Sequence, residues 1–127
     1  MQYGTVVQGR FLARPNRFIA LVEVDGAETV CHVKNTGRCR ELLRPGATVY
    51  LERSGNLLRK TAFDLIAVDK DGLLINMDAQ APNKVFGEFA RSFEPTTLDV
   101  KPEFVYGASR LDFCLTTPMG LHLVEVK

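Results

Sequence analysis

The sequence lacks several features that would assign a protein to a class at once. None of its apolar runs approaches the roughly 20 residues that span a bilayer, so no transmembrane helix is predicted. The first residues, MQYGTVVQGRF, lack the basic segment and following apolar segment of a secretory signal. There are no repeats, low-complexity tracts or long linkers. These absences predict a globular protein with no membrane partner.

Cysteines are few. There are three, an odd number, and no C-x-x-C motif. This usage predicts reduced thiols in a cytosolic protein. A zinc site formed by Cys31, His32 and Cys39 is the alternative, but their spacing fits no standard zinc pattern.

The composition is that of a globular domain with a core, since 46% of residues are hydrophobic and 24% are charged. The net charge of +1 hides an asymmetry. Residues 1–60 carry ten lysines and arginines against five acids, whereas residues 61–127 carry six against ten. A basic half beside an acidic half favours a polyanion-binding part next to a part with another task. The alternative is a solvated surface with chance clustering.

Short alternating segments dominate the first half and predict strands. Asp25-Gly26 is a strong hairpin signal, and Asp71-Gly72 predicts a second turn. The segment TGRCRELL predicts a short helical turn, capped by Asn35 or Thr36. About five strands with one short helix predict an OB-like barrel over residues 1–78, a common nucleic-acid-binding fold. The expected strands are YGTVVQGRFL, RFIALVEVDG, ETVCHVKN, ATVYLER, AFDLIAVDKDG and LLINMDA.

Basic side chains gather around the predicted helical turn and the first strands. Helix amides bind phosphate, and arginines add bidentate contacts. Phe11 and Phe18 lie between arginines, so they are candidates for stacking on bases, with barrel core as the alternative and the preferred interpretation for Phe18. His32 is expected to be packed or hydrogen-bonded. The residues predicted to bind DNA are Arg10, Arg14, Arg17, Lys34, Arg38 and Arg40.

The composition changes between about Asn76 and Asn83, which predicts a second domain over residues 79–127. Phenylalanines at helical spacing predict a helix from about Lys84 to Ser92, ending before a proline. A strand around KPEFVYG and a terminal hairpin, SRLDFCL-TTPMG-LHLVEVK, follow.

The terminal hairpin has a polar face and an apolar face. If its loop is symmetric about Pro118-Met119, Asp112 lies opposite Glu125, with Lys127 on the same face. Facing carboxylates repel each other unless a divalent cation lies between them, and paired oxygen ligands suit Mg²⁺ or Mn²⁺. The alternative is a solvated face with diagonal salt links. The residues predicted for the apolar core face are Leu111, Phe113, Leu115, His122, Val124 and Val126.

These motifs together resemble a known family. An acid on one strand with E-x-K on the next is similar to the PD-(D/E)xK nuclease core. The whole chain resembles the sugar fermentation stimulation protein A family. The segments that carry this resemblance are RPNRFIA, HVKNTGRCRELLRPG, APNKVFGE, YGASRLDFCL and LVEVK.

The resemblance implies an α+β protein, with an OB-like barrel followed by the first part of a PD-(D/E)xK nuclease-like core. It implies DNA binding and a link to sugar utilisation. By position, Asp112 and Glu125 would be the metal carboxylates and Lys127 the catalytic lysine. Glu88 would add a further catalytic acid from the helix, and Glu103 is a weaker candidate whose alternative is a surface glutamate.

Members of that family continue for roughly another hundred residues, so the resemblance implies that this chain is a fragment with little or no catalytic activity. Its last strand is expected to be an edge that can pair with another chain in a homo-oligomer. Three functions remain open. They are sequence-tolerant DNA binding with metal-dependent phosphodiesterase chemistry, DNA-binding regulation with a vestigial acidic site, and RNA binding by the OB-like module.

Overall fold

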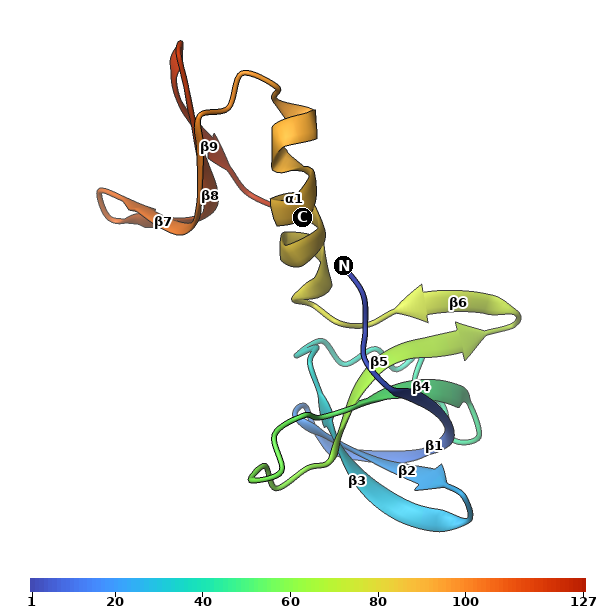
Figure 1. The fold of residues 1–127 in the computed structure, drawn as a ribbon. Coiled ribbons are helices and arrows are strands. Elements are labelled where there is room, and N and C mark those ends of the chain that lie inside the picture. Colours follow the sequence, from blue (N-terminus) through green and yellow to red (C-terminus); the bar gives the residue numbers. More distant parts are fainter. The chain divides into compact units, whose positions relative to one another are not determined.

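The computed structural model describes residues 1–127, which form two compact units. One unit comprises Gln2–Ala79, and the other comprises Gln80–Lys127 together with Met1. The first unit contains six strands, and the second contains one helix and three strands (Figure 1). No helix in the structure has the length and apolar character needed to cross a membrane.

The first unit is a closed barrel. Strands β1 to β5 follow the order β3-β2-β1-β4-β5, and β3 closes the ring by pairing in parallel with β5. This arrangement confirms the predicted OB-like barrel. Strand β6 extends the sheet beyond β5. The strands are β1 (Val6–Asn16), β2 (Ile19–Val24), β3 (Ala27–Val33), β4 (Thr48–Arg53), β5 (Phe63–Lys70) and β6 (Leu73–Asn76).

Alternating side chains of these strands fill the barrel. Two Asp-Gly turns set the register, since Asp25 and Gly26 have φ of 51° and 80°, and Asp71 and Gly72 have φ of 53° and 86°. Positive φ at both central residues is the type I′ geometry predicted for tight hairpins. The core members are Phe11, Ala20, Val22, Cys31, Val33, Leu43, Val49, Leu51, Phe63, Leu65, Val68 and Met77.

The helical turn predicted for TGRCRELL is confirmed only as a single turn at 39–43, and the residues before it form a bend after β3 instead of a helix. One i→i+4 bond forms, from Leu43 N to Cys39 O. Cys39 has φ of 49°, which a right-handed helix cannot contain. Arg14 binds the carbonyls of Asn35, Gly37 and Arg38, which a helix would need for its own ladder.

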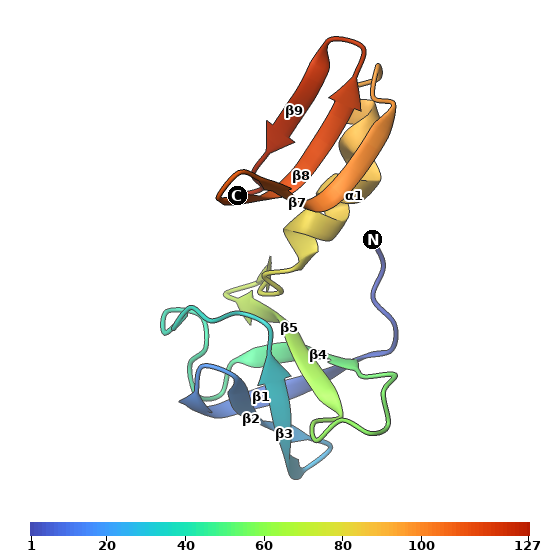
Figure 2. The same cartoon turned by 90° about the vertical axis from the view of Figure 1, so that its left-hand side faces the viewer.

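The second unit packs helix α1 (Ala81–Phe93) on an antiparallel sheet (Figure 2). The helix begins before the predicted Lys84, since a proline occupies its first turn, where no intrahelical N–H is needed. Phe86 packs against Phe113, with ring centroids 5.0 Å apart. The strands, in spatial order, are β7 (Asp99–Tyr106), β8 (Ser109–Thr117) and β9 (Gly120–Val124).

The register of the terminal hairpin is confirmed. Thr117 pairs with Gly120 around a Pro118-Met119 tip, and Phe113 pairs with Val124. The predicted faces are partly wrong. His122 is exposed rather than in the core, and Cys114, which is absent from the predicted core face, is buried.

Candidate functional site

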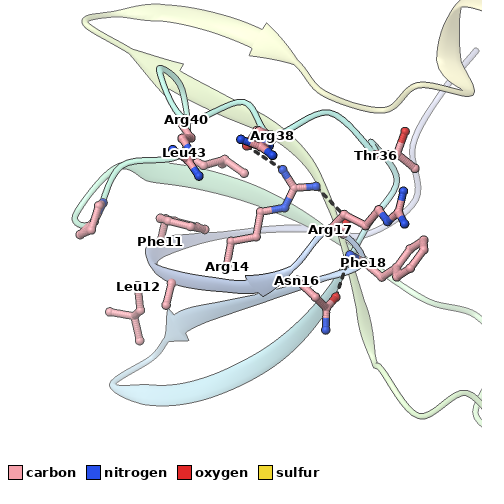
Figure 3. Close-up of a pocket in the computed structure, with 12 residues that line it drawn as sticks. Phe11, Leu12, Arg14, Asn16, Arg17, Phe18, Thr36, Arg38, Arg40 and Leu43 are labelled. Carbon is pink, nitrogen blue, oxygen red and sulfur yellow. Dashed lines mark hydrogen bonds between the residues drawn. The ribbon is translucent and has the colours of Figure 1, made fainter.

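A groove of about 740 Å³ lies on the barrel. Its walls are the second half of β1, the β1–β2 turn and the segment between β3 and β4 (Figure 3). Four of its lining residues are arginines, which strand and loop geometry bring together from distant parts of the sequence. We call it the arginine groove, and these residues are Arg14, Arg17, Arg38 and Arg40.

Arg14 holds the two walls of the arginine groove together. Its Nη1 donates to the carbonyls of Gly37 and Arg38, and its Nη2 donates to those of Arg17 and Asn35. In Figure 3 the Arg14 guanidinium lies between Arg17 and Arg38. Its terminal donors are therefore used within the protein, which makes Arg14 a positioning residue for the groove.

The other three groove arginines remain available to a ligand. Arg17, Arg38 and Arg40 are exposed, and none forms an ion pair with a carboxylate in the structure. Guanidinium groups can bind phosphate bidentately, so three of them give the groove a positively charged surface of a kind that suits anions.

Phe18 adds an aromatic ring to the rim of the groove. Its side chain is 51% exposed, whereas that of Phe11 is 2% exposed. The preference for Phe18 as barrel core is therefore wrong, and Phe11 is the core residue. Phe18 lies in the turn before β2, where its N–H and that of Ile19 donate to Asn16 Oδ1 at 2.8 and 3.0 Å. The signal for this turn is Pro15-Asn16.

The two remaining residues predicted to bind DNA do not line the groove. Arg10 is exposed on β1, paired in the ladder with Glu23 and Thr48. Lys34 is half-buried, and its Nζ lies 3.8 Å from Asp64 Oδ2.

Asp64 is the centre of a buried polar network on β5. Arg59 donates to both of its carboxylate oxygens, at 2.7 and 3.0 Å, and His32 Nδ1 lies 3.2 Å from Oδ1. The expectation of a hydrogen-bonded His32 is confirmed. Burial alone would raise the pKa of Asp64, but the hydrogen bonds and charge of Arg59, with Lys34 and His32, lower it below its ordinary value. This network ties the 54–62 loop to the barrel.

The acidic end of the terminal hairpin is built around Asp112. Asn83 Nδ2 donates to Asp112 Oδ1 at 3.2 Å, and the Val126 N–H donates to Oδ2 at 2.8 Å. Strand β9 ends at Val124, so its ladder stops one residue before Glu125. Lys127 Nζ lies 3.7 Å from Glu125 Oε2, and both side chains are at least half exposed.

The other two candidate acids, Glu88 and Glu103, form ion pairs of their own. Glu88 is exposed on α1 and forms an ion pair with the amino group of Met1. Glu103 forms an exposed ion pair with Arg110 at 2.9 Å, and its φ is 52°. No three His, Cys, Asp or Glu side chains gather as a metal-binding group.

Asp112 and Glu125 are nevertheless the type of ligand used in one mode of Mg²⁺ or Mn²⁺ binding. Such ions are commonly held by one or two carboxylates, with waters and phosphate oxygens as the other ligands. Each Asp112 oxygen accepts one hydrogen bond and keeps a second lone pair for a ligand.

The fold defines the class of protein: an OB barrel followed by an α+β unit. A family model described as the SfsA N-terminal OB domain matches residues 12–77. This match covers about half of the chain, and the chain belongs to the SfsA family.

Curated relatives agree with this assignment. The chain is 52% identical to a sugar fermentation stimulation protein homolog from Desulfitobacterium hafniense over 128 residues, and 50% identical to one from Clostridium beijerinckii over 130. These alignments cover 100% of this chain but 56% and 57% of the relatives. The chain thus spans a little over half of their length.

A solved structure is also similar across both units. It is that of Pyrococcus furiosus SfsA in complex with Ca²⁺, with a TM-score of 0.83 and 27% sequence identity. The match covers 98% of this chain and 55% of that one.

Proposed function

We propose that this protein binds DNA with little sequence preference, through the arginine groove of its OB barrel. The observation that supports this most strongly is the set of three exposed, unpaired arginines in one groove of a nucleic-acid-binding fold. Guanidinium contacts to phosphates position the strand and do not read its sequence. Arg17, Arg38 and Arg40 make these contacts, and Arg14 positions them. The protein acts in the cytosol, where its three free cysteines stay reduced.

The test is a salt series. Three phosphate contacts predict that the logarithm of the DNA association constant falls against the logarithm of salt concentration with a slope of about −2 to −3. Arg38→Ala should reduce this slope by about 1 and weaken binding to unrelated sequences alike. Arg10→Ala removes a charge outside the groove and is the matched control. Binding independent of salt, or an equal effect of Arg10→Ala, would contradict the proposal.

A second function is proposed for the terminal hairpin, namely metal-dependent phosphodiesterase chemistry. The supporting observation is Asp112, held by Asn83 and the Val126 N–H beside Glu125 and Lys127. The similar P. furiosus protein is in complex with Ca²⁺, a cation that also takes oxygen ligands. A bound Mg²⁺ or Mn²⁺ would lower the pKa of a water and polarise a phosphoryl oxygen. Lys127 would orient the phosphate, and Glu88 remains a further candidate acid.

The metal proposal has a readout that does not need activity. Mg²⁺ or Mn²⁺ should raise the melting temperature, because a ligand that binds only the folded state stabilises it. Asp112→Ala and Glu125→Ala should each abolish this rise, whereas Lys127→Ala should keep it and lose any cleavage. If the wild type shows no metal response and Asp112→Asn stabilises it, the acids are a surface group and a DNA-binding regulator is the better description.

A further inference from the structure

Phe18 is a fixed aromatic ring at the rim of the arginine groove. Its N–H donates to Asn16 Oδ1 at 2.8 Å, and its carbonyl accepts from Val33 N at 2.8 Å. The backbone is therefore held from both directions, by its own turn and by β3. About half of the side chain nevertheless remains in contact with solvent. An exposed ring on a held backbone is available to a ligand with little ordering cost.

Positive charge surrounds this ring. The Arg17 guanidinium carbon lies 5.4 Å from the centroid of Phe18, within cation–π distance. Arg38 and Arg40 line the same groove, and no carboxylate pairs with any of the three arginines. The groove thus combines an apolar ring for a flat group with guanidinium groups for anions.

We propose that the arginine groove takes single-stranded DNA, with one base stacked on Phe18 and the neighbouring phosphates on Arg17, Arg38 and Arg40. This rests on the proposed DNA binding and names its substrate class. In a duplex the bases stack on one another and hide their faces, so Phe18 would contact only the backbone. An unpaired base exposes its ring face, and every base has one, so stacking adds affinity without sequence preference.

The absence of tryptophan from the chain allows a direct test. Phe18→Trp introduces a single indole at the groove rim, and a stacked base quenches indole fluorescence. A single strand of about 12 nucleotides, within the range that one OB fold covers, should quench this emission. A duplex of the same sequence should leave it nearly unchanged. The matched control is Leu74→Trp, at an exposed position on β6 outside the groove, whose emission neither ligand should change.

Binding constants from fluorescence anisotropy complete the test. Phe18→Ala should weaken single-strand binding roughly 5- to 150-fold, the range for loss of one stacked base, and should leave duplex binding unchanged. Phe18→Leu, which keeps an apolar side chain but removes the ring, should act like Phe18→Ala and excludes a purely structural cause.

The outcomes separate this inference from the proposed function. If neither strand nor duplex binds with salt dependence, the proposed DNA binding itself is wrong. Suppose instead that the protein binds the duplex as tightly as the single strand, and that the Phe18 variants do not weaken single-strand binding more than duplex binding. In that case only the single-strand assignment is wrong. Tighter binding of an RNA strand of the same sequence would overturn the choice of DNA.

Discussion

Replacing Arg14 with lysine should disrupt the arginine groove although the charge is kept. The Arg14 guanidinium donates to four carbonyls from two separate segments, those of Arg17, Asn35, Gly37 and Arg38. A lysine ammonium has three donors at one point and cannot reproduce this planar fork. The substitution therefore releases both segments that present the other arginines.

The size of the effect follows from these bonds. Each hydrogen bond contributes about 0.5–1.5 kcal/mol net, and water can replace some of them because the side chain is only half-buried. Arg14→Lys should thus lower the free energy of unfolding by about 2–4 kcal/mol. For a unit of this size that corresponds to a fall in melting temperature of about 10–30 °C.

The assay is thermal unfolding by circular dichroism, with DNA binding measured by anisotropy below the transition. Arg40→Lys is the matched control, since no hydrogen bond or ion pair to Arg40 contributes to the groove walls, and it should keep wild-type stability. DNA affinity should fall as much in Arg14→Lys as in Arg14→Ala. An Arg14→Lys variant with wild-type stability and affinity would refute the positioning role and make Arg14 a simple phosphate contact.

Two further predictions concern the buried groups of the barrel. Asp64 has a lowered pKa in the folded protein, so its carboxylate stabilises the fold at any pH above the ordinary pKa of about 3.8. This stabilisation is lost as the pH falls through the pKa that Asp64 has in the folded state. Asp64→Asn should lower the free energy of unfolding by about 3 kcal/mol at neutral pH. It should also reduce the fall of this free energy at acid pH, and an unchanged fall at acid pH would contradict the prediction. Burial, with the nearby charge of Asp64, raises the pKa of Cys31 to about 11, so a thiol reagent at pH 8 should spare Cys31 in the native protein. The same reagent should modify the half-buried Cys39 and should not reach Cys114, which is buried in the second unit. Rapid modification of Cys31 without denaturant would show that the barrel core is open.

Local patterns were enough to predict much of the fold. Alternation and the two Asp-Gly turns predicted the barrel strands, because type I′ geometry depends on two adjacent residues. The register of the terminal hairpin followed from the two-residue tip at Pro118-Met119. Each of these features depends on residues close in the sequence.

Most of the errors arose where distant residues decide the structure. The basic segment at 36–43 has helical spacing, but Arg14 from β1 takes its carbonyls and Cys39 adopts a positive φ. The error at Phe18 was local: this residue shares the alternation of β2, but it lies in the Asn16 turn, one residue before β2 begins at Ile19. No local pattern indicated the ion pair of Lys34 with Asp64, which is 30 residues further along the chain.

The most direct test of the central claim, that the arginine groove binds DNA, is an amide NMR titration with a single strand of about 12 nucleotides. The account predicts that shift changes concentrate at residues 11–18 and 36–45, and that they disappear in the Arg17→Ala/Arg38→Ala/Arg40→Ala variant. Shift changes confined to the hairpin end around Asp112, or spread evenly over the exposed basic residues and unaffected by that variant, would contradict it.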